Sequence, residues 1–232
     1  MPNDSAFVVM AKQPQVGKTK TRLSPPLSPG EAVALYEALL LDTLALLAGL
    51  VQVDLAIAIT PPQSRPYFES IAPPGTLLLP VQGAAIGDCL AQALGKLLEM
   101  GYRKVLAINS DGPSLPLDYL QQALNLLEQT DIVLGLGHDG GYYLIGMKQL
   151  HLALFRGIPW STEQVLARTL ERAGGSGLRV GLTPTWYDVD TSTDLLRLQA
   201  EIDQISPDRL VHTRQILDRI NPSHGGEVTF LR

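Results

Sequence analysis

Cysteine is nearly absent from this sequence of 232 residues, and its net charge is small. The single cysteine, Cys89, has no partner for an internal disulfide, which is typical of a protein from a reducing cytoplasm. No cluster of cysteine and histidine has the spacing of a zinc site. The formal net charge of -5 argues against non-specific binding to nucleic acid or to an acidic membrane surface. We therefore expect neither a disulfide-stapled protein nor a nucleic-acid-binding one.

Long hydrophobic runs are also missing. The longest apolar stretch, residues 39–51, is interrupted by Asp42 and is too short to span a bilayer. The first residues lack a basic segment followed by a long apolar one, so we expect no signal peptide. With 45% hydrophobic residues and no internal repeat, the chain can bury one large core. We expect a cytoplasmic protein without membrane insertion, and an oligomer is compatible with the sequence.

Three familiar catalytic signatures are absent as well. The sequence has no Gly-x-Ser-x-Gly elbow of a hydrolase and no Gly-x-Gly-x-x-Gly of a dinucleotide-binding strand. Gly17, Lys18 and Thr19 superficially resemble a Walker A motif. That motif requires a glycine five positions earlier, where Lys12 stands, so we do not expect a P-loop NTPase.

Short apolar runs and amphipathic segments alternate along the chain. The runs that predict strands are residues 6–11, 53–59, 76–80, 105–108, 131–137, 142–147 and 178–182. Two predicted helices follow Ser28 and Ser161, each with a capping-box partner three residues later, and Thr191 with Asp194 can cap the helix predicted for residues 195–205. The other amphipathic segments that predict helices are residues 66–71, 86–100, 116–128 and 207–220. This alternation predicts a three-layer α/β fold whose central sheet is mostly parallel and partly mixed.

Positive charge is concentrated after the first predicted strand. The loop holds four cations in an otherwise acidic protein, at Lys12, Lys18, Lys20 and Arg22. Lysine supplies point charges and arginine a bidentate fork, and Gly17 lets backbone N–H groups approach, so the loop suits a phosphate chain. The alternative is a solvated basic loop without a ligand.

Carboxylates follow two later strands. Asp111 comes directly after a buried run, at the carboxyl end where α/β proteins bind ligands. Asp188 and Asp190 stand near the end of the last predicted strand. Hard oxygen ligands of this kind suit Mg²⁺ or Mn²⁺, with substrate phosphates completing the shell. The alternative is a structural role, because aspartate is common in turns and at helix starts. The same alternative holds for Asp88, whose carboxylate lies in the first turn of its predicted helix and interacts favourably with the helix dipole.

Five ordered motifs of the chain resemble an uncharacterised bacterial family of GT-A-like transferases in the nucleotide-diphospho-sugar transferase superfamily. The motifs are AKQPQVGKTKTRL, NSDGPSLP, DGGYYLIGM, GIPWST and DVDTSTDL. The first also resembles the loop of phospholactate guanylyltransferases, and the last resembles molybdenum-cofactor nucleotidyltransferases of the same fold. The resemblance implies a GT-A-like, Rossmann-like domain over residues 1–196. Residues 197–232 would form a helical extension packed on it.

The resemblance also implies roles for individual residues, and we place Asp88 with the nucleotide-binding set. The nucleotide-binding residues are then Lys12, Gly17, Lys18, Lys20, Arg22 and Asp88. The metal ligands are Asp111, Asp188 and Asp190, the catalytic residues Asp111 and Asp139, and the acceptor-binding residues Gly140, Gly141, Tyr142, Trp160, Ser161 and Thr162. The sequence departs from the family at His138, where an acidic residue is usual, and around Asp88.

Three functions agree with these residues. The first is metal-dependent transfer of a sugar from a nucleoside-diphosphate sugar to a small-molecule acceptor, with Asp139 as acceptor base. The second is nucleotidyl transfer from a nucleoside triphosphate to a small phosphorylated acceptor, with release of pyrophosphate; the cation-rich loop favours it. The third is a nucleotide-binding module without turnover, which the departures at His138 and Asp88 suggest.

Overall fold

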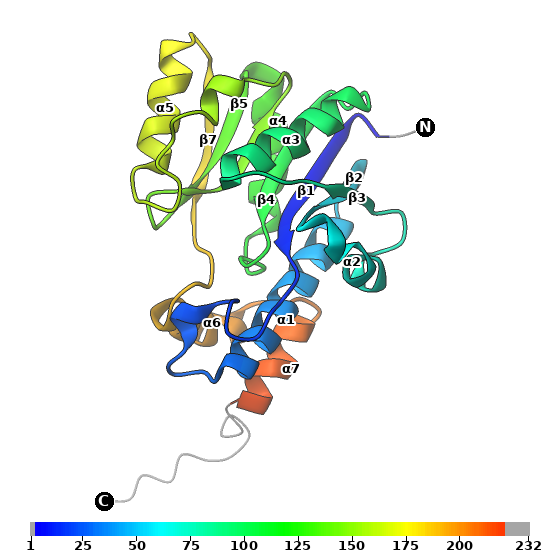
Figure 1. Ribbon diagram of the computed structural model, residues 1–232, viewed down its shortest axis with the longest axis vertical. Helices are drawn as coiled ribbons and strands as arrows, with labels where there is room; N and C mark the ends of the chain where they lie inside the picture. The colour runs from blue at the N-terminus through cyan, green and yellow to red at the C-terminus, as the bar shows by residue number, and fades with distance from the viewer. Residues whose placement is uncertain (1–2, 221–232) are drawn as a thin grey trace, which may run out of the picture.

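The computed structural model describes residues 3–220, which form one seven-stranded sheet with helices on both faces (Figure 1). The strands are β1 (Ser5–Lys12), β2 (Val53–Thr60), β3 (Leu77–Pro80), β4 (Lys104–Asn109), β5 (Ile132–Gly137), β6 (Tyr142–Met147) and β7 (Val180–Trp186). Their order across the sheet is β3-β2-β1-β4-β6-β5-β7. All neighbours are parallel except β6, which runs antiparallel to β4 and β5. The mostly parallel, partly mixed α/β fold expected from the sequence is therefore confirmed.

Within residues 3–220, seven α-helices cover this sheet and one of its ends. They are α1 (Pro29–Ala48), α2 (Arg65–Ile71), α3 (Ile86–Glu99), α4 (Leu117–Gln129), α5 (Val165–Gly175), α6 (Ser192–Glu201) and α7 (Val211–Ile220). Among residues 3–220, no helix is long and apolar enough to cross a membrane.

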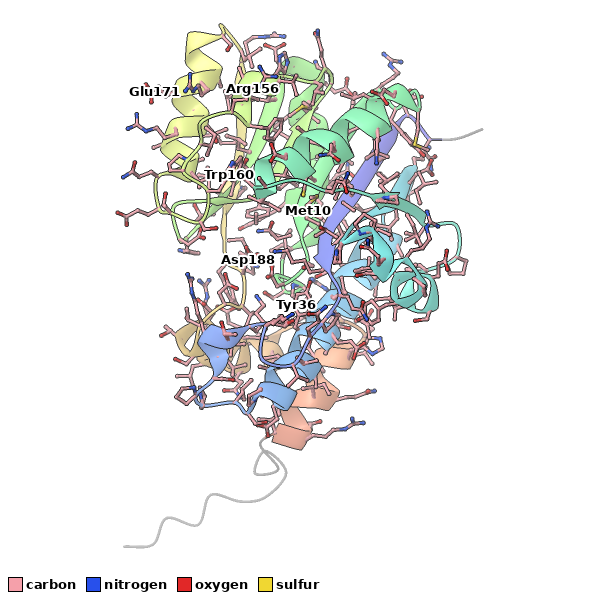
Figure 2. All side chains as sticks on the ribbon, in the orientation of Figure 1. Met10, Tyr36, Arg156, Trp160, Glu171 and Asp188 are labelled. Atoms are coloured by element: carbon pink, nitrogen blue, oxygen red, sulfur yellow. The ribbon has the colours of Figure 1, made fainter. Side chains whose placement is uncertain are left out.

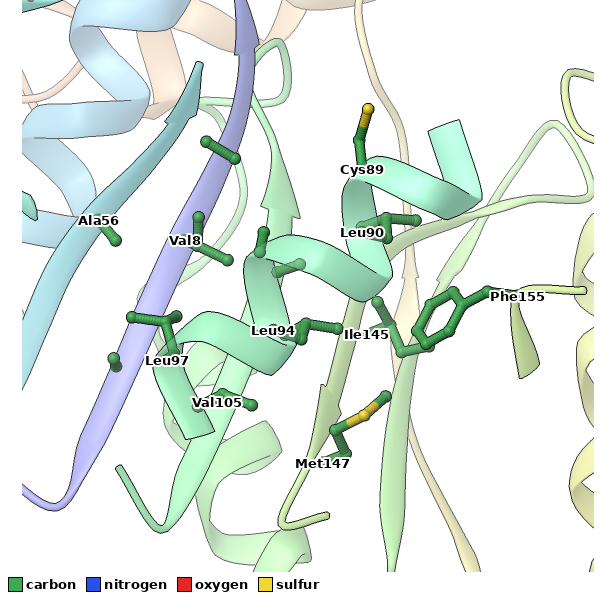
Figure 3. Close-up of a cluster of buried hydrophobic side chains, with 14 of the residues drawn as sticks. Val8, Ala56, Cys89, Leu90, Leu94, Leu97, Val105, Ile145, Met147 and Phe155 are labelled. Atoms are coloured by element: carbon green, nitrogen blue, oxygen red, sulfur yellow. The ribbon is translucent and has the colours of Figure 1, made fainter. Parts of the chain in front are cut away.

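Strand alternation divides the core into two layers. Ala6 and Val8 of β1 face α3, in an apolar layer that also includes Ala173 of α5 and that Figure 3 shows around Leu94. Phe7 and Val9 face the opposite way and pack with α1, α2 and α4. Residues 6–9 of β1 are thus fully buried on both faces of the sheet, as the continuous apolar run predicts.

A third apolar cluster lies beyond the sheet, where α6 and α7 pack with the first half of α1 (Figure 1). Asp42 of α1 is buried there and accepts hydrogen bonds from the backbone N–H groups of His212 and Thr213, at 3.1 and 2.7 Å. The helix predicted from residue 207 therefore begins only at Val211. The expected domain boundary at residue 196 lies inside α6, and the domain division stays a prediction; residues 221–232 are outside the described part.

Two predicted helix starts are confirmed and one is wrong. Ser28 caps α1 with Glu31 as its partner, and Thr191 caps α6. Ser161 caps no helix, because its backbone is left-handed with φ 64° and α5 begins at Val165. The segment before α5 instead packs on the loop after β5, where Leu166 N–H donates to the Gly140 carbonyl at 2.9 Å. A tertiary contact thus replaces the local capping box.

Strand register determines which loops meet at the edge of the sheet. Met10 of β1 pairs with Asn109, the last residue of β4, and β1 continues two residues further to Lys12. The cation-rich loop after β1 therefore starts next to the turn that carries Asp111, as expected for parallel neighbours.

Candidate functional site

A cleft of about 820 Å³ opens beyond the carboxyl ends of β1 and β4. Met10, Tyr36 and Asp188, labelled in Figure 2 near the middle of the molecule, are among the residues that line it. The cleft lies where the sheet meets the α1–α6–α7 cluster. The complete lining is Met10, Lys12, Lys18, Thr19, Lys20, Thr21, Arg22, Tyr36, Ile86, Asn109, Ser110, Asp111, Asp139, Ser161, Thr162, Glu163, Asp188 and Asp190.

Lys20 is at the centre of the polar contacts in this cleft. Its ammonium donates to Asp111 Oδ2 and to Asp190 Oδ1, each at 2.6 Å. The side chain of Lys20 is only 6% exposed, whereas those of Asp111 and Asp190 are 19% and 48% exposed. Burial alone would lower the pKa of Lys20, but the two carboxylates outweigh it and raise that pKa above its usual value. Lys20 is therefore a fixed positive charge at neutral pH.

The backbone at Lys20 has an unusual conformation that aims this side chain. Lys20 has φ 49° and ψ 42°, in the left-handed region that non-glycine residues seldom adopt. The 3-10 helix η1 (Thr21–Leu23) follows at once, and Leu23 is fully buried. The loop is thus anchored directly after the lysine.

Asp188 supplies a third carboxylate, bound differently. Its Oδ2 accepts a hydrogen bond from Asn109 Nδ2 at 2.6 Å. Burial, with the nearby Asp111 carboxylate, raises the pKa of Asp188 well above its usual range. Gly112 allows this close approach, because a Cβ there would lie 2.9 Å from Asp188 Oδ1. Val189 N–H also donates to the Asp111 carbonyl at 3.0 Å, so the two carboxylate-bearing segments are joined by backbone as well.

Tyr36 of α1 forms one side of the cleft. Its hydroxyl lies 3.0 Å from Ser110 Oγ and accepts from the Lys12 backbone N–H at 3.3 Å. The Lys20 ammonium is 5.9 Å from the centre of its ring. Tyr36 therefore holds the first loop, α1 and the Asp111 turn together.

The opposite wall combines the loop after β5 with the segment before α5. Asp139 Oδ1 accepts from the Gly141 backbone N–H at 2.9 Å. Gly140 has φ 82°, and a Cβ there would lie 2.2 Å from the Glu163 carbonyl oxygen. The two segments are thus in backbone contact, which only glycine permits here.

The structure brings together most of the residues that the sequence singled out. Those that line the cleft are Lys12, Lys18, Lys20, Arg22, Asp111, Asp139, Ser161, Thr162, Asp188 and Asp190. Those outside its lining are Gly17, Asp88, Gly140, Gly141, Tyr142 and Trp160. The ligand roles assigned to all of them stay predictions.

Three of the residues outside the lining have structural contacts of their own. Asp88 Oδ2 accepts from the backbone N–H groups of Ala84 and Ala85, at 3.0 and 3.1 Å, and so caps the start of α3. Trp160 packs edge-on against Tyr142, with ring centres 6.3 Å apart. Tyr142 lines a small second pocket of about 30 Å³ that shares Met10, Ile86 and Asn109 with the cleft.

Sequence reasoning missed several residues of the cleft. Tyr36 stands at helical spacing with apolar residues, and an aromatic residue in that pattern usually packs in a core, so the pattern does not indicate a site residue. Asn109 and Ser110 immediately precede Asp111, and their place at a strand end was the signal that could have identified them. Glu163 follows Ser161 and Thr162 in a segment whose pattern indicates a helix start rather than a ligand contact.

The carboxylates of the cleft can hold a divalent ion only if a bound ligand supplies further oxygen donors. Within residues 3–220, no group of three or more His, Cys, Asp or Glu side chains is arranged to hold a metal ion. Asp111 and Asp190 nevertheless converge on one point, where the Lys20 ammonium lies. Mg²⁺ is commonly held by one or two carboxylates together with substrate phosphates and water. The donor set therefore fits a metal that is bound jointly with a phosphate chain.

Comparison with known proteins supports this fold. The chain resembles the crystal structure of a "putative nucleotide-diphospho-sugar transferase" from Desulfovibrio desulfuricans G20, with 32% identity and a TM-score of 0.87, over 95% of this chain and 96% of that one. A 4-diphosphocytidyl-2C-methyl-D-erythritol synthase from Anaerococcus prevotii DSM 20548 has 12% identity and a TM-score of 0.57, over 86% and 98% of the two chains. A CMP:2-keto-3-deoxy-manno-octonic acid synthetase complexed with CTP has 13% identity and a TM-score of 0.52, again over 86% and 98%. The last two likenesses concern the fold alone.

Among curated proteins, none matches the chain. Residues 43–162 match a family described as "Uncharacterized protein conserved in bacteria (DUF2064)". That segment is more than half of the chain and includes α3, β4, the Asp111 turn and the Asp139 loop. This protein therefore belongs to the bacterial family DUF2064 and has the fold of nucleotide-diphospho-sugar transferases.

Proposed function

We propose that this protein is a metal-dependent transferase that acts on a nucleotide donor. One observation carries the proposal: Asp111 and Asp190, from segments far apart in sequence, converge on one cationic point in the cleft. The cleft is also lined by all four cations of the first loop. A phosphate chain bridged to the carboxylates by Mg²⁺ or Mn²⁺ satisfies both sets of charges.

The first candidate reaction is transfer of a sugar from a nucleoside-diphosphate sugar to a small-molecule acceptor. It is supported by the fold and by the relative with 32% identity, whose description names a nucleotide-diphospho-sugar transferase. The leaving group of such a reaction is a nucleoside diphosphate, on which negative charge develops. Lys12, Lys18 and Arg22 line the cleft and stabilise that charge by fixed positive charges in a partly enclosed site.

The remaining groups have distinct tasks in this proposal. A bound Mg²⁺ or Mn²⁺ supplies Lewis-acid neutralisation of the phosphate oxygens. Asp111 and Asp190 would hold the ion. Asp188 would lie next to them, held in place by its hydrogen bond from Asn109. Asp139 on the opposite wall receives the proton of the acceptor hydroxyl as general base.

The second candidate reaction is nucleotidyl transfer. Here an acceptor phosphate or hydroxyl attacks the α-phosphate of a nucleoside triphosphate, and pyrophosphate leaves. The specific observation in its favour is that all four cations, at Lys12, Lys18, Lys20 and Arg22, line the same cleft. A triphosphate needs more neutralisation than a diphosphate sugar does.

A product screen separates these candidates. The full chain is incubated with each of the four nucleoside triphosphates and with a panel of nucleoside-diphosphate sugars, with Mg²⁺ or Mn²⁺ and a mixture of small acceptors. Release of nucleoside diphosphate from a sugar donor supports glycosyl transfer, whereas metal-dependent release of pyrophosphate supports nucleotidyl transfer. As a control, Arg103→Ala removes an exposed cation just before β4, at the end of the strands opposite the cleft, and should form the same products as the unaltered protein.

A third outcome of the screen points to a module without turnover. In that case a nucleotide raises the melting temperature, no product forms, and Asp111→Ala binds the nucleotide as well as the unaltered protein does. Loss of tenfold or more in affinity on Asp111→Ala, about 1.4 kcal/mol, rules against such a module.

A further inference from the structure

Lys20 lies at the point where a shared metal ion would contact Asp111 and Asp190. Its ammonium is 2.6 Å from one oxygen of each carboxylate. An ion bound to the same two oxygens would overlap the ammonium or lie beside it, and the two positive charges would repel each other. The ammonium and the metal therefore cannot both occupy the point where these oxygens converge.

The contact is built into the fold rather than formed by a mobile surface lysine. Lys20 is the residue whose left-handed backbone turns the loop toward the carboxylates. Its side chain is 6% exposed and passes close to the Tyr36 ring, whereas Lys18 of the same loop is exposed. Lys20, rather than another lysine of the loop, thus neutralises Asp111 and Asp190.

We propose that the Lys20 ammonium and a divalent cation are alternative occupants of the Asp111–Asp190 pair, so that the metal enters together with the donor phosphates. This inference rests on the proposed function. Displacement leaves the ammonium without its two partners in a buried position, which is unfavourable unless another anion receives it. The phosphate chain of the donor is that anion, because the other cations of the loop already hold it next to Lys20.

Such an exchange couples metal binding to donor binding. By thermodynamic linkage, the metal strengthens donor binding by the same factor by which the donor strengthens metal binding. Free metal alone binds weakly, since it must displace the Lys20 ammonium when no other anion is present to receive that charge. Removing the charge of Lys20 therefore strengthens binding of free metal while weakening the coupling.

The test is a titration of the full, nucleotide-free chain with Mn²⁺, in which electron paramagnetic resonance measures the free ion. Lys20→Met keeps the length and apolar stem of the side chain and removes its charge. We expect Mn²⁺ to bind Lys20→Met at least tenfold more tightly than the unaltered protein. Lys18→Met, which removes the same charge from the same loop, is the control and gains less than threefold. Asp190→Asn added to Lys20→Met abolishes the gain.

A second variant keeps the test decisive if the first one does not fold. If circular dichroism shows that Lys20→Met is unfolded, Lys20→Gln carries the comparison, because its amide still donates a hydrogen bond to the carboxylates. Equal Mn²⁺ affinity of a folded Lys20 variant and the unaltered protein overturns the inference. So does a gain of the same size in Lys18→Met, since that would reflect net charge alone.

The same titration, repeated with each nucleoside triphosphate and nucleoside-diphosphate sugar, separates failure of the inference from failure of the proposed function. If the unaltered protein binds a donor with Mn²⁺ but Lys20→Met shows no gain for free Mn²⁺, the inference fails and the proposed function stands. If neither protein binds any donor with Mn²⁺, the proposed function fails and the coupling fails with it.

Discussion

Asn109 and Asp188 are joined by a 2.6 Å hydrogen bond between the amide Nδ2 and the carboxylate Oδ2. Asn109 ends β4, and Asp188 follows β7, yet β6 and β5 lie between these strands in the sheet. The segment after β7 therefore approaches the end of β4 before it reaches α6, and Figure 1 shows this stretch running from β7 to α6 beyond the sheet. The position of the Asp188 carboxylate in the cleft depends on this path of the chain.

Removing the amide of Asn109 should destabilise the protein. Asn109→Ala leaves the Asp188 carboxyl group without its donor in a buried position, at a cost of about 1–3 kcal/mol in the free energy of unfolding. Urea denaturation measures it, with Asn125→Ala on the exposed face of α4 as the control. In the double variant with Asp188→Ala, the losses should be less than additive; strict additivity would mean that the bond contributes nothing.

A methyl group at Gly112 should disturb the cleft. It would lie 2.9 Å from Asp188 Oδ1 and 3.1 Å from the Tyr187 carbonyl oxygen, so a backbone segment must shift. We expect Gly112→Ala to lower the free energy of unfolding by about 1–3 kcal/mol. Gly174→Ala in α5 meets open space and is the control, with an expected gain of up to about 1 kcal/mol. Equal stability of the two variants would contradict the close approach.

Arg209 should stabilise the turn that carries Asp111. Its Nη2 donates to the carbonyl groups of Pro113 and Leu115, at 2.9 and 2.8 Å. Arg209→Ala removes both bonds, and we expect a loss of about 1–3 kcal/mol in unfolding free energy together with faster hydrogen exchange in residues 110–116. Arg168→Ala, which removes only an exposed pair with Glu171, should change neither quantity measurably.

Cys89 should react slowly with alkylating reagents. Burial and the nearby Asp88 carboxylate raise the pKa of its thiol. A raised pKa means less thiolate at any pH below it, so the alkylation rate should increase at a higher pH than in the unfolded chain. Mass spectrometry after iodoacetamide treatment at several pH values measures this. A native rate equal to that of the urea-unfolded protein at pH 8 would show that Cys89 is not a core residue.

Local pattern and strand direction were enough to predict much of the site. The apolar runs gave every strand of the described chain to within a few residues, and parallel neighbours end at one edge, so Lys20 and Asp111 were expected to meet. The capping boxes at Ser28 and Thr191 were equally readable, because a box uses only residues three apart.

Other features depended on contacts that no local pattern encodes. Which of the four cations contacts the carboxylates follows from the left-handed backbone at Lys20 and from the ring of Tyr36 on another element. The bond from Asn109 to Asp188 follows from strand order. Ser161 failed as a helix cap because its segment packs on the Gly140 loop, and tertiary packing outweighed a local preference of about 1 kcal/mol.

The most direct test of the account is calorimetric titration of metal–donor complexes into the unaltered protein and into Asp111→Asn, with Asp4→Asn as the control at an exposed acid. The account predicts that one class of donor, triphosphate or diphosphate sugar, binds the unaltered protein and Asp4→Asn with Mg²⁺ or Mn²⁺. It also predicts a loss of tenfold or more both in Asp111→Asn and when EDTA replaces the metal. Donor binding that is equally tight in Asp111→Asn and in EDTA would contradict a metal-bridged phosphate chain at Asp111 and Asp190.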